Sequence, residues 1–267
     1  MYRPKLFKNT RFFLGLILVL ITIHKTYGQG GAYEIQVYGS ELVKPHSTMV
    51  ELHSNYTAQG FTQADSYGVL PDQGVFHETL EITHGWNEWL ETGFYFFNTI
   101  GSAGRSGYVG SHIRPRITFP ERLGIPFGLS FSAEVGFQKA RYNSDLWTLE
   151  LRPIFDKVFF KNLYISLNPV FDKSFKGSTQ KQGLVFSPNV KLGYDFTKAL
   201  NLGFEYYGNL GPLNGIYPPD QQNHQIFFVT DLNLSPRWEF NAGIGLGLTP
   251  NTEGLVFKTI IGRRFGK

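Results

Sequence analysis

The sequence predicts an all-β protein: a closed antiparallel transmembrane β-barrel of about 12 strands, preceded by a cleavable signal peptide. Three observations support this prediction. Apolar and polar residues alternate over segments of about ten residues, the length that a tilted strand needs to cross a bilayer. These segments recur in an even number from residue 47 to the end of the chain. The chain also begins with a short apolar stretch that follows several basic residues.

Residues 1–28 are typical of a secretory signal peptide. Four basic residues lie within the first eleven positions, and an apolar core of twelve residues follows from Phe12 to Ile23. Thr26 and Gly28 are small enough for the −3 and −1 positions of a cleavage site. An uncleaved membrane anchor is the alternative, but this core is shorter than the ~20 residues that a spanning helix needs. We therefore expect cleavage after Gly28.

Removal of this segment changes the charge of the chain. The formal net charge of +4 comes from 25 basic and 21 acidic residues, and five of the basic ones precede residue 29. The mature chain would carry 20 basic against 21 acidic residues, which gives no support to a nucleic-acid partner. Cysteine is absent, so disulfides, thiolate metal sites and a lipid-modified N-terminal cysteine are excluded. We expect neither a cofactor nor a metal site.

The remaining chain divides into two parts. Residues 29–46 show little pattern and are expected to form a periplasmic segment ahead of the barrel, in which Tyr33 to Tyr38 are compatible with a small strand. Residues 47–267 are assigned to the barrel. An even number of strands returns the chain to the side where it entered and leaves no unpaired edge. The expected strands cover residues 47–58, 74–84, 89–98, 108–118, 127–138, 145–156, 162–172, 183–195, 201–208, 224–233, 238–248 and 254–265.

The hairpin at residues 75–97 shows the alternation most clearly. Phe76, Leu80 and Ile82 share one face of an extended strand, and His77 and Glu81 lie on the other face. A tight polar turn at residues 85–88 then leads into a second alternating arm. A soluble β-sandwich would alternate as well, so the signal peptide, strand length, even strand number and placement of tryptophans decide the prediction.

Three tryptophans lie beside short turns. Trp86 and Trp89 lie at the turn of the hairpin at residues 75–97, and Trp238 follows the short link at residues 235–237. Aromatic side chains form girdles at the two interfaces of outer-membrane barrels, so we expect these three tryptophans at a membrane interface.

The connections differ in length in a regular way. The two longest, at residues 60–73 and 209–223, follow odd-numbered strands, whereas most links after even-numbered strands are tight. The exception is the link at residues 119–126, which holds two prolines. Outer-membrane barrels have short periplasmic turns and longer external loops, so both termini are expected in the periplasm.

The polar strand faces hold charged side chains of both signs, and any function should lie there. The expected register brings Glu91 close to Arg114. The charges either pair and fill a narrow lumen or form a basic track that guides anionic solutes. Alternation of acids with bases favours pairing. The expected lumen-lining cluster comprises Glu91, His112, Arg114, Arg116, Glu134, Glu150 and Arg152.

No catalytic pattern is found. Outer-membrane phospholipases and lipid A deacylases place a histidine and a serine two residues apart on one strand face, whereas His53 and Ser54 are adjacent and therefore on opposite faces. The segment from His77 to Glu81 lacks the second histidine of a zinc protease. We therefore predict no catalytic residue and no enzymatic activity.

Several segments resemble one family of barrels: EIQVY (34–38), ITHGWNEWLETG (82–93), LELRPIFD (149–156), LNPVFD (167–172) and LGFEYYGNLGP (202–212). They are similar to a family of uncharacterised bacterial outer-membrane β-barrels, labelled as phenol-degradation-pathway or transporter proteins. The resemblance implies an outer-membrane barrel and assigns no substrate or catalytic residue. Such barrels commonly end on an aromatic residue that the assembly machinery recognises, whereas here Phe265 is followed by two further residues.

Two functions are compatible with the sequence. One is a porin-like narrow channel or transporter for small solutes, and the alternative is a closed barrel with a structural or assembly role. The expected location is the outer membrane of a diderm, Gram-negative bacterium. The expected partners are outer-membrane lipid, the barrel-assembly machinery and a small solute in the lumen.

Overall fold

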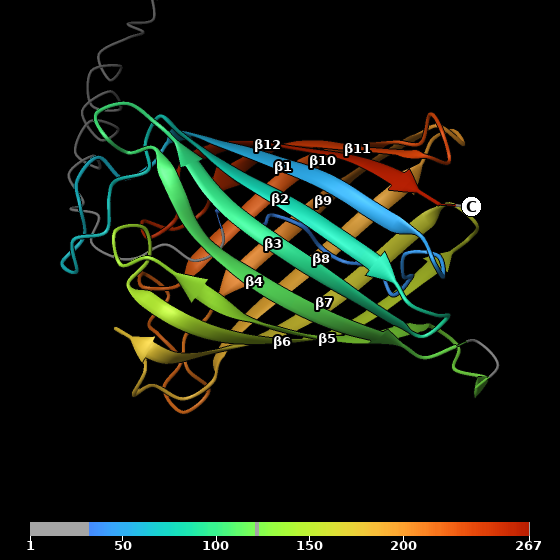
Figure 1. Cartoon of the computed structure of the whole chain (residues 1–267), viewed down its shortest axis with the longest axis horizontal. Helices are drawn as coiled ribbons and strands as arrows, with labels where there is room; N and C mark the ends of the chain where they lie inside the picture. Colours follow the sequence, from blue (N-terminus) through green and yellow to red (C-terminus); the bar gives the residue numbers. More distant parts are fainter. Residues whose placement is uncertain (1–31, 121–122, 267) are drawn as a thin grey trace, which may run out of the picture.

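The computed structural model describes residues 32–120 and 123–266, which form one closed barrel of twelve strands (Figure 1). Each strand pairs antiparallel with its neighbours in sequence, and β1 pairs with β12 to close the ring. The strands are β1 (Thr48–Gln59), β2 (Val75–Gly85), β3 (Leu90–Ile100), β4 (Gly107–Thr118), β5 (Gly128–Gln138), β6 (Asp145–Phe159), β7 (Leu163–Gly177), β8 (Val185–Asp195), β9 (Leu200–Asn209), β10 (Asn223–Leu232), β11 (Trp238–Gly247) and β12 (Leu255–Phe265). The predicted fold class and strand number are confirmed.

The strand boundaries follow the prediction closely, with one region of difference. β6 and β7 each contain 15 residues and run beyond residues 156 and 172, where the predicted strands end. The prediction ends too early because an Asp-Lys pair, at residues 156–157 and 172–173, interrupts the apolar alternation, although the exposed Phe159 and Phe175 lie beyond. Within the described residues, no helix is long and apolar enough to cross a membrane. The predicted signal peptide lies outside the described residues.

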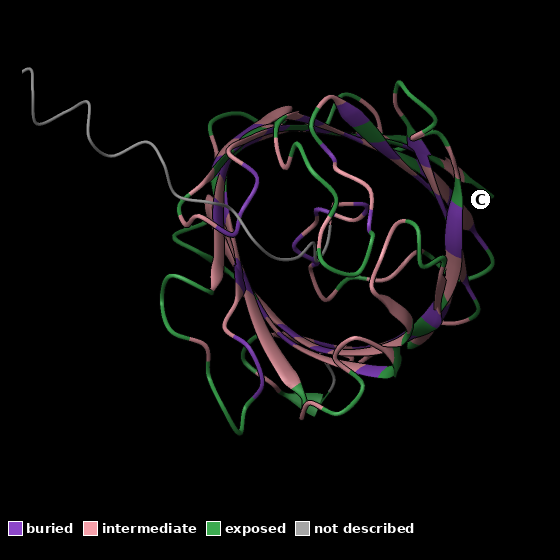
Figure 2. Ribbon diagram, turned by 90° about the vertical axis from the view of Figure 1, so that its left-hand side faces the viewer, coloured by how far each residue is buried: buried purple, intermediate pink, exposed green. Residues whose placement is uncertain are grey.

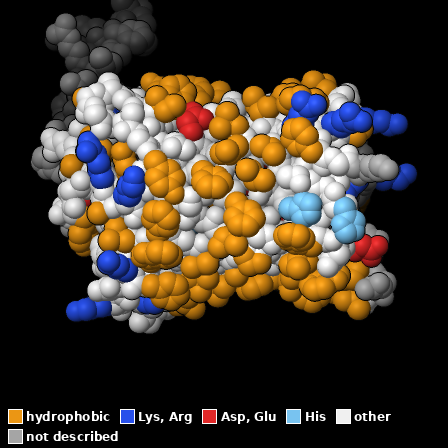
Figure 3. Space-filling model, viewed as in Figure 1, with side chains coloured by type: hydrophobic (Ala, Val, Ile, Leu, Met, Phe, Trp, Pro, Cys, Tyr) orange, Lys and Arg blue, Asp and Glu red, His pale blue; other side chains and the backbone are white. Residues whose placement is uncertain are grey.

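The two faces of the wall differ as alternation requires. On β2, His77, Thr79 and Glu81 are buried, whereas Phe76 and Leu80 are exposed on the outside. Figure 3 shows the result: a broad band of hydrophobic side chains covers the wall, with lysine and arginine side chains gathered towards its two ends. A surface of this kind matches the hydrocarbon layer of a membrane, where an outward charge costs roughly 2–4 kcal/mol at mid-depth.

Aromatic side chains lie at both ends of this band. Trp86, Trp89 and Trp238 project outward at the end with the short turns and are 38–50% exposed. Trp147 lies near the start of β6, at the opposite end, and its ring packs against Phe137 with a centroid distance of 5.6 Å. Sequence analysis did not assign Trp147 to an interface, because no short turn lies beside it.

The N-terminal segment, residues 32–47, lies inside the barrel rather than ahead of it. The start of the coloured chain in Figure 1 runs through the interior, and an end-on view shows chain crossing the ring of strands (Figure 2). The segment is irregular, so the small strand considered for Tyr33–Tyr38 does not form. Its first described residues lie level with the half of β1 that leads into the long loop at residues 60–74, and its end leaves the lumen at the end with the short turns. The expectation that these residues precede the barrel is therefore wrong.

Candidate functional site: a lumen filled by the N-terminal segment

Side chains of the barrel wall hold the main chain of the N-terminal segment. Asn55 and Thr79 donate hydrogen bonds to the carbonyl oxygen of Tyr33, at 3.3 and 2.7 Å. The Lys258 Nζ donates to the carbonyl oxygen of Ile35 at 3.0 Å. Buried peptide groups must find partners, and here side chains provide them instead of a neighbouring strand.

The same arrangement continues through the middle of the lumen. Asn168 of β7 accepts a hydrogen bond from the Tyr38 main-chain nitrogen at 2.8 Å and donates one to the Tyr38 carbonyl oxygen at 2.9 Å. Ser166 donates to that oxygen at 2.6 Å. Near the exit, the Val43 nitrogen donates to Glu91 at 2.7 Å. Such separate contacts can break without disrupting the strand ladder of the barrel.

Two apolar contacts fix the first described part of the segment. Tyr33 and Ile35 are both buried and pack against opposite walls of the barrel. The partners of Tyr33 are Tyr95, Phe97 and Val109, and those of Ile35 are Phe227, Val229 and Val256. Burial of these two side chains adds a hydrophobic contribution of about 1.5–3 kcal/mol each to the polar contacts.

The Tyr38 ring lies among three arginines. The guanidinium carbons of Arg114, Arg152 and Arg116 are 4.4, 4.7 and 5.4 Å from the ring centroid. Each distance is within the range of a cation–π interaction. The Tyr38 hydroxyl donates to the carboxyl of Glu34. Burial raises the pKa of the Glu34 carboxyl well above its ordinary value, because low dielectric disfavours the charged form.

Arg114 and Arg116 also pair with carboxylates of the wall. Arg114 Nη2 lies 2.9 Å from Glu81 Oε1 and 3.6 Å from Glu91 Oε1, and Arg116 Nε lies 2.8 Å from the same Glu91 oxygen. All four side chains are buried. Arg116 also donates to two carbonyl oxygens of the N-terminal segment, at 3.1 and 2.8 Å. This network joins β2, β3 and β4 to the segment.

The other residues of the expected lumen-lining cluster form two local pairs. Arg152 and Glu150 of β6 make two hydrogen bonds with each other, at 2.7 and 2.9 Å. His112 Nδ1 lies 2.6 Å from Glu134 Oε1, across the β4–β5 pair. Hence the structure places all seven residues on the inner wall, but as a network around Tyr38 with a separate His112–Glu134 pair.

A second ion-pair network lies on the wall formed by β8 to β12. Lys191 Nζ is 2.8 Å from Asp231 and 3.2 Å from Glu205, and Lys258 forms a close ion pair with the same glutamate. Sequence analysis placed these residues on polar faces but did not bring them together, because they lie on four strands. The alternation along a strand shows which face of the wall a residue occupies. Its contacts with other strands depend on the register of strand pairing around the barrel.

Some inward carboxylates have no cationic partner. Asp156 accepts hydrogen bonds from Tyr164 and the Ser40 main-chain nitrogen, and Asp172 accepts one from Ser187. Among the described residues, neither aspartate forms an ion pair. The described lumen therefore holds paired arginines and lysines together with surplus carboxylates, rather than a continuous basic track.

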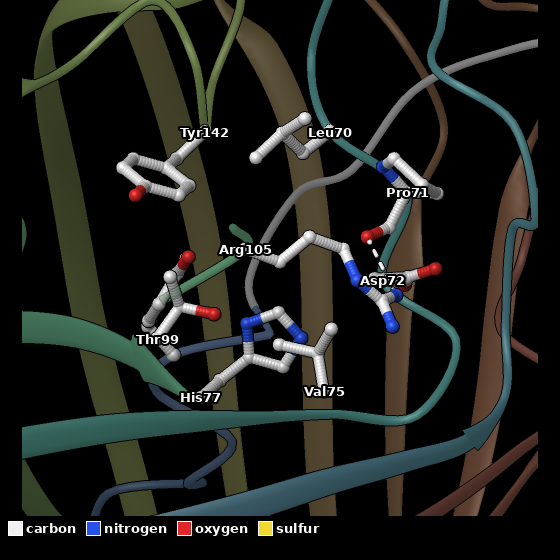
Figure 4. Close-up of a pocket in the computed structure, with 9 residues that line it drawn as sticks. Leu70, Pro71, Asp72, Val75, His77, Thr99, Arg105 and Tyr142 are labelled. Atoms are coloured by element: carbon white, nitrogen blue, oxygen red, sulfur yellow. Dashed lines mark hydrogen bonds between the residues drawn. The ribbon is translucent and has the colours of Figure 1, made fainter. Parts of the chain in front are cut away.

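A small pocket lies between the long loops beside β2 and β3 (Figure 4). Arg105 donates to the carbonyl oxygens of Pro71 and Gln73, at 3.4 and 2.6 Å, and so joins the loop that precedes β2 to the loop that follows β3. His77 and Tyr142 line the cavity beneath, which measures about 10 Å³. A space of this size is at the lower limit for one water molecule.

The first strand separates the two side chains that a nucleophilic site would need to combine. His53 is buried in the lumen, whereas Ser54 donates a hydrogen bond of 2.6 Å to Glu78 on the outer face. The two side chains therefore project to opposite sides of the wall, and they cannot act together as base and nucleophile.

Comparison with known proteins gives similarity of fold. No family model matches the chain, and no curated protein is significantly similar to it. The structure is similar to an outer-membrane channel from Pseudomonas putida F1, with a TM-score of 0.59 and 12% identity, over 87% of this chain and 100% of that chain. It is also similar to the NanC porin, with a TM-score of 0.55 and 9% identity, over 82% of this chain and 100% of that chain. A third similar structure is the KdgM porin, with a TM-score of 0.53 and 10% identity, over 82% of this chain and 99% of that chain.

These structures share the barrel fold and little sequence with the chain. The fold of this protein is therefore that of outer-membrane porin-like barrels. The particular family to which the quoted sequence segments are similar stays a prediction.

Proposed function

We propose that the protein is an outer-membrane channel for small solutes, and that its own N-terminal segment closes the passage. The observation that carries the proposal is how this segment is held. Wall side chains hydrogen-bond its main chain at Tyr33, Ile35 and Tyr38 without strand pairing. Withdrawal of the segment would leave all twelve strands paired around a polar lumen. The porin-like fold of the neighbours and the apolar outer band support the membrane location.

The alternative is a permanently closed barrel with a structural or assembly role. The dense contacts around Tyr38 favour it, because three arginines and the Glu91 carboxylate would lose contacts with the segment if it moved. The two functions differ in one respect. A channel must spend part of its time with the segment displaced, and a structural barrel need not.

Solute uptake by liposomes tests the proposal. The mature chain, reconstituted without a tag, should admit small sugars and amino acids, and planar bilayers should show brief stepwise openings. A chain that lacks residues 29–46 should conduct continuously and so calibrate the fully open lumen. Complete absence of openings and uptake by the mature chain, with a conducting deletion variant beside it, would favour the structural role.

A further inference from the structure

Three polar side chains converge on the inner wall where β1 meets β2. Glu51 and His53 come from β1 and Glu81 from β2, and all three are buried. Glu51 and Glu81 are direct partners in the β1–β2 register, and His53 lies two residues along the same face. One possible ligand atom from each side chain lies within 4.8 Å of the other two.

His53 is the observation that points to a ligand. Its side chain is fully buried, Nδ1 has no hydrogen-bond partner among the described residues, and Nε2 meets only Glu81, in poor hydrogen-bond geometry. Its Nε2 lies 3.3 Å from Glu81 Oε2, which also lacks a hydrogen bond. Buried polar groups are nearly always bonded, so unsatisfied atoms that face each other call for a third species between them.

The distance between these atoms fits a shared metal ion. Two ligand atoms that each lie about 2.0–2.2 Å from a tetrahedral zinc ion are about 3.3–3.6 Å apart. A hydrogen bond between nitrogen and oxygen is shorter, with a usual length of about 2.9–3.0 Å. The 3.3 Å between His53 Nε2 and Glu81 Oε2 therefore matches the separation of two ligands on one ion.

We infer that Glu51, His53 and Glu81 form a binding site for a divalent transition-metal ion, with Zn²⁺ as the best match. One imidazole nitrogen and two carboxylate oxygens suit zinc, whereas Ca²⁺ and Mg²⁺ prefer oxygen ligands alone. Water would complete a tetrahedral site. Sequence analysis expected no metal site, because the ligands lie on two strands and their local sequence matches no zinc motif.

Arg114 already orients one of these ligands. Its Nη2 binds Glu81 Oε1 at 2.9 Å, which leaves Oε2 turned towards His53. Partners of this kind fix the position of metal ligands in known sites. The charge also suits a cation, because Glu51 forms no ion pair or hydrogen bond within the described part of the chain.

The chain offers a matched control in a second buried pair. His112 Nδ1 and Glu134 Oε1 are 2.6 Å apart, a short hydrogen bond, and no other residue in the described part of the chain forms a three-ligand group with them. Loss of His112 should therefore remove a buried imidazole without removing metal binding. This contrast separates coordination from a general effect of histidine loss.

Equilibrium dialysis against Zn²⁺ tests the inference. The mature chain, without a histidine tag and treated with chelator, should bind one equivalent of Zn²⁺. Glu51→Gln and His53→Gln should each lower the affinity about 10-fold or more, while His112→Gln should leave it unchanged. The shift in electrophoretic mobility on heating verifies that each variant is folded. X-ray absorption at the zinc edge should detect a single imidazole ligand.

Two results would overturn the inference. One is well under one equivalent of bound zinc on the folded mature chain when free zinc in the dialysis buffer is in excess over the protein. The other is zinc binding that His53→Gln and Glu51→Gln both leave intact, which would locate the ion elsewhere on the chain.

Discussion

Tyr38 is the residue at which the N-terminal segment and the barrel wall meet most closely. Its ring contacts three guanidinium groups, and Asn168 forms hydrogen bonds with both its main-chain nitrogen and its carbonyl oxygen. The side chain therefore contributes to retention of the segment in a way that the main-chain contacts do not. Removal of the ring should weaken the closed state and leave the fold of the barrel intact.

We predict that Tyr38→Ala increases the open fraction of the channel. The lost cation–π contacts are worth about 0.5–2 kcal/mol each, so the open fraction measured in single-channel recordings should rise about 10-fold or more. Tyr38→Phe is the control, because it keeps the ring and removes only the hydroxyl. If Tyr38→Ala and Tyr38→Phe open equally often, the ring does not hold the segment.

The arginines should differ in their importance for stability. Arg114→Ala leaves Glu81 and Glu91 without this partner in a buried network, which should cost about 3–5 kcal/mol. Arg152→Ala should cost less, since its partner Glu150 is 21% exposed. Urea unfolding in detergent measures both changes. Equal losses for the two variants would contradict this ranking.

At the same scale, ion selectivity distinguishes the two interpretations of the charged wall. Because Arg114 and Arg152 are paired, the double change to alanine should lower stability and leave the ion selectivity unchanged. Reversal potentials measured across a salt gradient provide the test. A clear loss of anion preference in a stable double variant would restore the basic track as the better description.

Sequence reasoning reached the residue scale only in part. Parity placed Glu91, Arg114 and Arg116 on the inner face, and a hairpin register brought the first two together. It did not find Glu81 as the closest partner of Arg114, which is two strands away. Tyr38 was also missed, because its partners on the barrel wall lie more than fifty residues along the chain and no local pattern reports them.

At the scale of elements, the β4–β5 pair contains a close approach that only glycine allows. A Cβ added at Gly110 would lie 1.9 Å from the main-chain oxygen of Phe137, and that oxygen cannot move without displacing β5. Gly110→Ala should destabilise the barrel by about 3 kcal/mol. Gly215 lies in open space in a loop, so Gly215→Ala is the control.

Heat-modifiable mobility and urea midpoints of these two variants measure the effect. Gly110→Ala should assemble poorly or unfold at lower urea, and Gly215→Ala should match the parent. A Gly110→Ala barrel as stable as the parent would mean that β4 and β5 can separate locally at no cost.

The loops give a prediction about orientation. Epitope tags inserted at Asp65 and Gln221 should be accessible on intact cells, because they lie in the long links, and a tag at Asn87 should be hidden. Antibody labelling of intact and permeabilised cells is the measurement. The opposite labelling pattern would reverse the assignment of periplasmic and external ends.

The strands and their boundaries were predicted better than any other feature of this structure. Strict alternation between apolar and polar residues defined the strand faces, and turn residues defined most boundaries. The extensions of β6 and β7 were missed, since an Asp-Lys pair interrupts the apolar alternation at the start of each extension. The N-terminal segment was misplaced for a different reason: side chains of the wall satisfy its main chain, and such contacts leave no periodic signal in the sequence.

At the scale of the whole molecule, the barrel and the N-terminal segment form two separable parts. The twelve strands close on themselves, and the segment adds contacts without adding a strand. The central claim is that displacement of the segment opens the lumen.

A reversible tether tests this claim most directly, and the absence of native cysteine makes it feasible. A Cβ added at Gly128 would lie 2.1 Å from Ser40 Oγ and 2.0 Å from an Asp156 carboxylate oxygen, which must shift to make room. Ser40→Cys with Gly128→Cys then places two thiols side by side and can join the segment to β5. Single-channel currents of this variant should show no openings while the disulfide is intact, and openings like those of the single-cysteine variants after reduction. Openings of the same size and frequency with the disulfide intact, as verified by mass spectrometry, would contradict the account.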